Sequence, residues 1–215
     1  TTNSAGRGGA VAPFGSGAGT VTGSTFSQNA ATSRGGALYA QNGTSLTVAS
    51  SAFDGNAAQT GGAINSRGTL TVESSAFDTN AATLSGGAIA AGDGALYIAS
   101  STFSGSTANS FGGALESQVD TVRIENTTFA GNTAGNGGGA MNVQSIASVS
   151  HELVNVTVTG NAAYGANRGG GILTSGSGFV QLTNSIVSGN YATVVGDAEI
   201  AGTLDAASSG NVIGA

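Results

Sequence analysis

Large apolar residues recur along this chain at the end of a repeated tetrad, Gly-Gly-Ala followed by an apolar residue. The tetrads end at Val11, Leu38, Ile64, Ile89, Leu115 and Met141, and a degenerate Gly-Gly-Gly-Ile tetrad ends at Ile172. Between tetrads, apolar and polar residues alternate in short runs bounded by Gly, Asn and Ser, which predicts short β-strands. The complete tetrads follow one another at spacings of 25 residues (Gly61 to Gly86) to 27 residues (Gly8 to Gly35). A period of this length predicts a solenoid.

A second motif, Phe-x-x-Asn, alternates with the tetrads. Its members are Phe26, Phe53, Phe77, Phe103 and Phe129, followed three residues later by Asn29, Asn56, Asn80, Ser106 and Asn132; weaker copies pair Val158 with Asn161 and Val187 with Asn190. An Asn side chain in a turn bonds to nearby backbone groups and tolerates left-handed conformations. Stacked Asn amides also bond to one another along a solenoid axis.

Each period holds three short strand-like runs, exemplified by residues 62–65, 69–73 and 75–78 of the third repeat. Three strands in so few residues fit one triangular coil of a parallel β-helix, in which each strand pairs with its equivalent one period on. We therefore predict an all-β solenoid of about seven to eight coils, each with three short strands. The chain is expected to be one domain, 1–215, with regular repeats over 1–142, an irregular coil over 143–157, degenerate repeats over 158–190 and a closing coil over 191–215.

Equivalent positions should stack into ladders, since parallel strands lie about 4.8 Å apart. Those expected to point inward are Leu38, Ile64, Ile89, Leu115, Met141 and Ile172 at the ends of the tetrads, the pairs Leu46/Val48, Leu70/Val72, Leu96/Ile98 and Val122/Ile124, the Phe residues, and Ser51, Ser75, Ser101 and Thr127. The Ala of each tetrad is expected to point outward, as a strip formed by Ala37, Ala63, Ala88, Ala114 and Ala140. The paired glycines should supply a positive φ or a close approach at the turn.

Composition narrows the functions that this fold can serve. The formal net charge is −6 and only 7% of the residues are charged. This balance disfavours nucleic-acid binding, which needs a basic stripe. The absence of cysteine excludes disulfides, iron–sulfur clusters and thiolate zinc sites. No apolar run is long enough for a transmembrane helix.

The two alternating motifs resemble the GGA[ILV] and FxxN repeats of the bacterial polymorphic outer-membrane proteins, and more loosely the exported right-handed β-helix repeat proteins. The similarity extends over residues 8–190, with Ser106 as the clear departure. The resemblance implies a right-handed parallel β-helix at a cell surface or in a secreted protein, commonly an adhesin. It implies no catalytic residues.

One surface patch carries candidate chemistry. Glu73, Tyr97, Arg123 and Glu125 are expected at equivalent outward positions of the second face in successive coils, with the two carboxylates two coils apart. A pair of carboxylates at about 9–10 Å suits an inverting glycosidase. The simpler interpretation is a surface ion pair beside a solvated tyrosine, and we predict no catalytic residue.

Two further positions are candidate ligand sites. His151 is the only histidine and lies in the irregular 144–151 segment, where we expect a solvated loop residue. Asp54 and Asp78 should be neighbours in adjacent coils, and paired carboxylates recruit calcium. Their equivalents Ser27, Ser104 and Ala130 do not continue a calcium ladder. We therefore expect no cofactor, with calcium left open.

These inferences favour a non-enzymatic, extracellular or cell-surface β-helix that is structural or adhesin-like. The tetrad ending at Val11 begins close to the start of the chain, so the chain is either cut from a longer one or meets another subunit there. Self-association of the first coil (residues 8–14) with the last (203–213) would build a head-to-tail filament. A host or cell-surface glycan or protein is the other expected partner. The alternative function is a polysaccharide-active enzyme or carbohydrate-binding β-helix.

Overall fold

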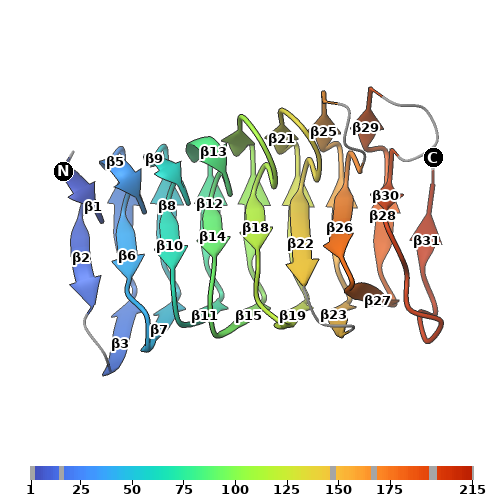
Figure 1. The fold of residues 1–215 in the computed structure, drawn as a ribbon, viewed down its shortest axis with the longest axis horizontal. Coiled ribbons are helices and arrows are strands. Elements are labelled where there is room, and N and C mark those ends of the chain that lie inside the picture. Colours follow the sequence, from blue (N-terminus) through green and yellow to red (C-terminus); the bar gives the residue numbers. More distant parts are fainter. Residues whose placement is uncertain (1–2, 15–16, 146–148, 166–168, 194–197, 215) are drawn as a thin grey trace.

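The computed structural model describes residues 3–14, 17–145, 149–165, 169–193 and 198–214. These residues form a parallel β-solenoid whose coils follow one another along the long axis (Figure 1). No helix occurs within the described ranges. The prediction of an all-β parallel solenoid is thus confirmed.

Within the described residues, the strands of successive coils form four parallel sheets, three of eight strands and one, sheet C, of seven. Sheet A, which follows the Asn turn, contains β1 (Ser4–Arg7), β5 (Ala30–Arg34), β9 (Ala57–Thr60), β13 (Ala81–Ser85), β17 (Thr107–Ala108), β21 (Thr133–Ala134), β25 (Ala162–Ala163) and β29 (Tyr191–Ala192). Sheet B, which follows the tetrads, contains β2 (Val11–Phe14), β6 (Leu38–Ala40), β10 (Ile64–Ser66), β14 (Ile89–Ala91), β18 (Leu115–Ser117), β22 (Met141–Ser145), β26 (Ile172–Gly176) and β30 (Ile200–Ala201).

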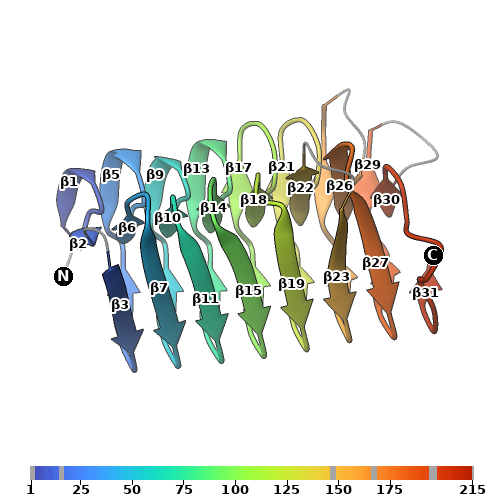
Figure 2. The same cartoon turned by 60° about the horizontal axis from the view of Figure 1, so that its bottom comes forward.

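The other two sheets complete the coil. Sheet C contains β3 (Gly17–Thr22), β7 (Thr44–Ala49), β11 (Thr69–Glu73), β15 (Ala95–Ala99), β19 (Thr121–Glu125), β23 (Ser150–Val154) and β27 (Phe179–Thr183). Sheet D contains β4 (Thr25–Ser27), β8 (Ala52–Asp54), β12 (Ala76–Asp78), β16 (Thr102–Ser104), β20 (Thr128–Ala130), β24 (Thr157–Thr159), β28 (Ile186–Ser188) and β31 (Val212–Ile213). Figure 2 brings the strands of sheet C forward.

Sheet A consists of a fourth short strand in each coil, which the expectation of three strands per coil omitted. It forms because the short Ala-rich run after each Asn turn pairs with the same run one coil on, as in Ala57↔Ala81 and Ala81↔Thr107. These strands shrink to two residues from β17 onward within the described ranges. Runs this short carry almost no alternation, so the pattern of a single coil does not mark them as strands.

The predicted core ladders lie inside the solenoid. The apolar residues that end the tetrads from Leu38 to Ile172 are fully buried, and so are Leu70 and Val72 of sheet C. The register pairs Ile64 with Leu38 on one side and Ile89 on the other. Apolar residues of similar size therefore stack upon one another in this inner ladder.

Five phenylalanines form a continuous stack on sheet D. The ring centroids of Phe53 and Phe77 lie 4.7 Å apart, and those of Phe77 and Phe103 lie 4.6 Å apart, with interplanar angles of 2° and 5°. Phe26 and Phe129 extend the stack at its two ends. The strand spacing of a parallel sheet imposes this near-parallel stacking.

The Asn ladder lies at the turn from sheet D into sheet A. Asn56 Nδ2 donates to Asn80 Oδ1 at 3.0 Å, and the Asn56 backbone N–H donates to the same oxygen. Asn80 Nδ2 in turn donates to the Phe53 carbonyl at 2.9 Å. At the far end Asn190 donates to Glu199 at 2.6 Å, so a carboxylate from the closing coil terminates the ladder.

The two glycines of each tetrad have different roles. The first, such as Gly61, has a φ of 62°, a left-handed conformation that other residues rarely adopt. The second, such as Gly62, has no room for a side chain, because an added Cβ would lie 2.0 Å from the Gly87 carbonyl oxygen of the next coil. The tetrad is therefore a turn through which adjacent coils approach closely.

The Ala that follows the glycines is buried, and the expected outward Ala strip is wrong. Ala37, Ala63, Ala88, Ala114 and Ala140 have no exposed surface. This Ala lies in the corner before the strand of sheet B begins, so it does not alternate with the next residue. Ala and the following Leu, Ile or Met both face the core.

The segment around His151 also differs from expectation. Residues 146–148 lie outside the described ranges, but Ser150–Val154 forms β23, which pairs with β19 and β27. His151 is fully buried, so its assignment as a solvated loop residue is wrong. It occupies an inward position because alternation in β23 places Glu152 outside. In the tail, residues 194–197 lie outside the described ranges, while β30 and β31 extend sheets B and D.

Candidate functional site

The outward face of sheet B carries a ladder of mixed chemistry, most of whose members are buried. Its members, in register from coil to coil, are Tyr39, Asn65, Ala90, Glu116, Asn142 and Leu173. Asn65 is 7% exposed, Glu116 6% and Asn142 3%. Outward polar side chains are normally solvated. Burial of these three shows that the face is recessed.

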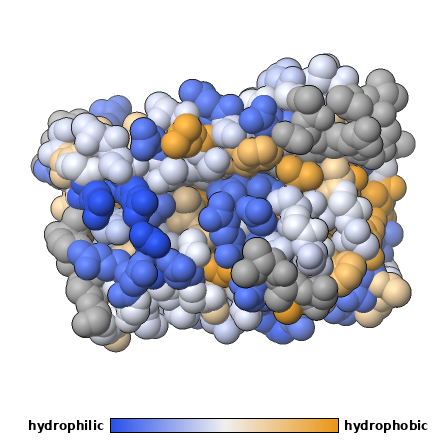
Figure 3. All heavy atoms as spheres, in the orientation of Figure 1, coloured by the Kyte–Doolittle hydropathy of each residue, from blue (hydrophilic) through white to orange (hydrophobic). Residues whose placement is uncertain are grey.

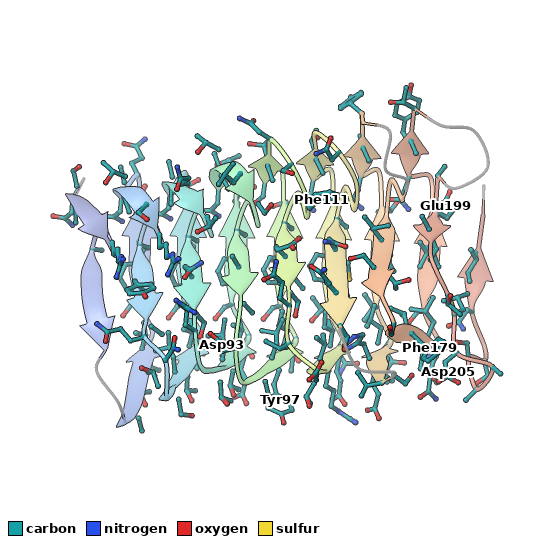
Figure 4. The ribbon with its side chains drawn as sticks, viewed as in Figure 1. Asp93, Tyr97, Phe111, Phe179, Glu199 and Asp205 are labelled. Atoms are coloured by element: carbon teal, nitrogen blue, oxygen red, sulfur yellow. The ribbon has the colours of Figure 1, made fainter. Side chains whose placement is uncertain are left out.

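A groove of about 460 Å³ lies over this ladder. Asn65, Ala90 and Glu116 lie along its floor, while Thr60 at the end of β9 and Arg67 after β10 contribute to its walls. Figure 3 views this side of the molecule, and Figure 4 places Asp93 and Phe111 at opposite ends of the sheet B strands. Four successive coils supply the walls, because the lining extends from Arg34 to Gln118.

Glu116 is the ionisable group at the centre of this face. Burial raises its pKa from the ordinary 4.5 to about 7, and hydrogen bonds from Asn142 and Gln118 oppose the increase. Asn142 Nδ2 donates to Glu116 Oε2 at 3.0 Å, and Gln118 Nε2 donates to Oε1 at 3.4 Å. The carboxyl can therefore exchange a proton near neutral pH, a property typical of functional sites.

Asn65 has an amide group that is not fully paired. Its Nδ2 donates to Thr60 Oγ1 at 3.3 Å, whereas its buried Oδ1 has no hydrogen-bond partner within the described part of the chain. Exchanging the amide oxygen and nitrogen would leave the NH₂ group unpaired instead. A buried polar group without a partner costs about 1–3 kcal/mol. The groove floor thus holds unused hydrogen-bonding capacity.

An ion pair lies at the rim of the groove. Arg67 Nε lies 3.2 Å from Asp93 Oδ2, and both side chains are substantially exposed. A second hollow of about 480 Å³ shares Gly92, Asp93 and Gln118 with the groove and extends toward Asp120 and Gln144. The recessed surface is therefore longer than the first hollow alone.

The sequence-predicted patch lies on sheet C. Tyr97 and Arg123 belong to one outward row, in register with Thr71 and Glu152. Glu73 and Glu125 belong to the neighbouring row, separated by Ala99. The expectation that all four residues occupy equivalent positions is therefore wrong, because Glu73 and Glu125 lie two residues further along their strands than Thr71 and Arg123. Tyr97 is labelled in Figure 4, at the edge of the molecule away from sheet A.

One arginine of this patch pairs with two carboxylates. Arg123 forms ion pairs with both Glu125 and Glu152. These carboxylates raise the pKa of Arg123 above its ordinary value, Glu125 being the larger influence. Because Glu125 is paired with Arg123, the arrangement is an exposed ion cluster. Glu73 forms no ion pair with Arg123.

The remaining candidates are structural or dispersed. The Phe and Asn ladders lie in the core and at its corner, with the Asn residues that they contain buried. Asp54 and Asp78 are neighbours in sheet D, where Thr79 donates to Asp54 and Ser104 to Asp78. The described residues contain no group of three His, Cys, Asp or Glu side chains that could hold a metal ion. They also contain no apolar helix of membrane-spanning length.

Reasoning from sequence missed Glu116 as a site residue. The available signal was its place directly after the tetrad, where equivalent residues are Tyr39, Asn65, Ala90 and Asn142. A charged residue at that position is unusual in a chain with 7% charged residues. Its burial, however, arises from neighbouring coils and is not visible in its own repeat.

Comparison with known proteins supports the repeat assignment. Residues 23–41 match the Chlamydia polymorphic membrane protein (Chlamydia_PMP) repeat. No curated protein and no solved structure matches the chain. The matched segment contains Phe26, Asn29 and the tetrad ending at Leu38, which are the motifs that recur in register along the solenoid. The chain is a parallel β-solenoid built from repeats similar to those of the Chlamydia polymorphic membrane proteins.

Proposed function

We propose that this chain is a non-enzymatic, surface-exposed β-solenoid of the adhesin-like or structural kind. The observation that carries the proposal is the match of residues 23–41 to a repeat of polymorphic membrane proteins. The same motifs recur through the stacked coils. A repeat of this class favours an outer-membrane or cell-surface location.

The construction of the solenoid suits a presenting scaffold. Its core ladders hold each coil in register with the next, so the outward faces keep their relative positions over the full length. Side chains on the outward face of sheet C vary from coil to coil, as Thr71, Tyr97 and Arg123 show. A rigid core with variable outer positions is suited to recognising a partner.

Surface exposure is tested with antibodies raised against the folded protein. The expected result is labelling of intact cells of the source organism, without permeabilisation. A cytoplasmic protein of the same cells, detected in parallel, should be labelled only after permeabilisation. Labelling of the solenoid only after permeabilisation would contradict the proposed location.

Self-association through the ends of the solenoid is the finer part of the proposal. Within the described chain, β1 and β2 lie at one end of sheets A and B, and β29 and β30 at the other. Exposed backbone edges of this kind accept a further strand. The Val11 N–H already donates to the Ala37 carbonyl of the next coil at 3.0 Å, so Val11→Pro would weaken the pairing of β2 with β6 and would leave the outer edge unchanged. Assembly is therefore tested on the wild-type protein: we expect filaments in electron micrographs at high concentration, and a protein that stays monomeric under these conditions would contradict head-to-tail assembly.

A polysaccharide-active enzyme is the alternative, and the groove with Glu116 is the observation that favours it. Reducing-sugar release from neutral and acidic polysaccharides tests it. We expect no release by the wild type, and no change in folding for Glu73→Gln or Glu125→Gln, because exposed charges contribute little to stability. Cleavage that is abolished by Glu116→Gln, Glu73→Gln or Glu125→Gln would favour the enzyme.

A further inference from the structure

The groove over sheet B contains a local indentation above Ala90. Asn65, Ala90 and Glu116 lie in register on three successive strands. The outer two are therefore two strand spacings apart, about 9.6 Å at the backbone. Ala90 has no side chain beyond Cβ, so two larger polar side chains flank an open space on the floor.

The two flanking side chains offer complementary hydrogen bonds. Asn65 is more than nine-tenths buried, lines the groove and has an unpartnered Oδ1 among the described residues. Glu116 is buried to a similar degree and accepts from Asn142 and Gln118, which leaves lone pairs available on its carboxyl. A ligand hydroxyl can both donate and accept, so one type of ligand group satisfies both side chains.

The charge of the groove disfavours a strongly charged ligand. Arg67 and Asp93 neutralise one another at the rim. The raised pKa of Glu116, about 7, leaves this carboxyl only partly ionised at neutral pH. Arg34 is the remaining charged residue in the lining. The lining of the groove has few net charges and several groups that donate or accept hydrogen bonds. Such a lining is suited to an uncharged polyhydroxy compound.

The shape of the groove favours an extended ligand over a single ring. Its lining spans the coils from Arg34 to Glu116, three strand spacings or about 14 Å. The adjoining hollow extends it past Gln118. Ala90 and Gly92 provide a smooth floor on which the C–H face of a sugar ring can lie, and Leu84 gives an apolar edge.

We propose that the sheet B groove binds a neutral oligosaccharide, with one sugar ring above Ala90 and its hydroxyls bonded to Asn65 and Glu116. This inference goes beyond the proposed surface role, because it assigns a ligand class to a site that the repeat motifs do not specify. Glycan binding is measured on purified protein. A failure to bind glycans would therefore not contradict the proposed surface location. A failure of surface labelling would likewise not contradict the proposed glycan site.

The test uses substitutions that the ladder itself already contains. Ala90→Asn fills the indentation with the residue found at equivalent positions 65 and 142. Asn65→Leu removes the amide with its unpartnered Oδ1 and introduces the residue found at position 173. Glu73→Gln, on sheet C, is the matched control. Unfolding temperature and far-UV circular dichroism establish that each variant is folded.

Isothermal titration calorimetry is performed with cellotetraose, maltotetraose, mannotetraose and chitotetraose, with tetragalacturonate as an acidic comparison and a neutral tetrapeptide as a non-saccharide comparison. We expect at least one neutral tetrasaccharide to bind, and Ala90→Asn and Asn65→Leu each to weaken it about tenfold or more, which corresponds to about 1.4 kcal/mol. Glu73→Gln should bind like the wild type. The proposal is overturned if no neutral tetrasaccharide binds at millimolar concentration, if only the acidic saccharide or the peptide binds, or if both groove variants bind as tightly as the wild type.

Discussion

The aromatic stack gives the sharpest stability prediction, through the substitution Phe77→Ala. Phe77 is fully buried and stacked between Phe53 and Phe103 at centroid distances of 4.7 and 4.6 Å. The backbone pairing of β12 with β8 and β16 fixes the neighbouring rings, so they cannot move inward to fill the space. A buried Phe→Ala change costs about 3–5 kcal/mol, and restricted collapse places this site in the upper part of that range.

Phe26→Ala is the matched control, because Phe26 is only half-buried and stacks on a single neighbour, Phe53, at 4.9 Å. Its loss should cost about 2 kcal/mol or less, since less apolar surface is removed from the core. The double variant Phe77→Ala/Phe103→Ala should be less destabilised than the sum of the single variants by about 0.5–1.5 kcal/mol, the worth of one aromatic pair.

Urea unfolding followed by far-UV circular dichroism measures these free energies, with tyrosine fluorescence as a second probe of the same transition. Thermal unfolding should show a decrease of about 8–20 °C for Phe77→Ala, since each kcal/mol shifts a chain of this size by about 2–4 °C. Equal losses for Phe77→Ala and Phe26→Ala, or a loss below about 1 kcal/mol for Phe77→Ala, would refute the argument that the stack is a rigid part of the core.

Four further substitutions test the corner, the groove and the tetrad. Asn80→Ala should cost about 1–3 kcal/mol in urea unfolding, because Asn56 and the Phe53 carbonyl lose their hydrogen-bond partner; equal stability in the two proteins would show that the Asn ladder contributes nothing. Glu116→Gln should flatten the pH dependence of the free energy of unfolding. The pKa of Glu116 is about 7 in the folded protein and 4.5 ordinarily, so the wild type loses stability as the pH rises from about 4.5 through 7. At pH 8 the variant should therefore be more stable than the wild type by up to about 3 kcal/mol. A wild type and variant with parallel unfolding temperatures from pH 5 to 8 would contradict the raised pKa. Gly62→Ala should prevent folding or cost several kcal/mol, because its Cβ would lie 2.0 Å from a backbone oxygen, whereas Gly92→Ala should be nearly neutral, its Cβ having only one neighbour, at 3.9 Å; similar solubility and stability for the two variants would argue against the close approach of coils.

The sequence by itself determined the architecture, because a solenoid repeats the same contacts in every coil. Leu38, Ile64 and Ile89 recur at one period, and parallel strand pairing places residues one period apart side by side. Local alternation then predicts which of them face inward. The same reasoning explains why Phe77 lies between two other phenylalanines.

Other features depended on contacts that no single repeat contains. The burial of Ala63 follows from the corner geometry of the tetrad, and the burial of His151 from the pairing of β23 with strands on both sides. The pattern of alternation describes only straight strands, so it placed Ala63 on the wrong side. The extra length of the repeat that contains His151 concealed the burial of that residue.

The groove over sheet B was likewise decided by tertiary structure. Asn65, Ala90 and Glu116 come from different repeats and differ from one another in size and charge, so periodicity treats them as noise. Only the stacking of coils places the small residue between the two polar ones and surrounds all three with walls. A repeat determines what its copies share, whereas a binding site on a solenoid arises where the copies differ and the fold brings the differences together.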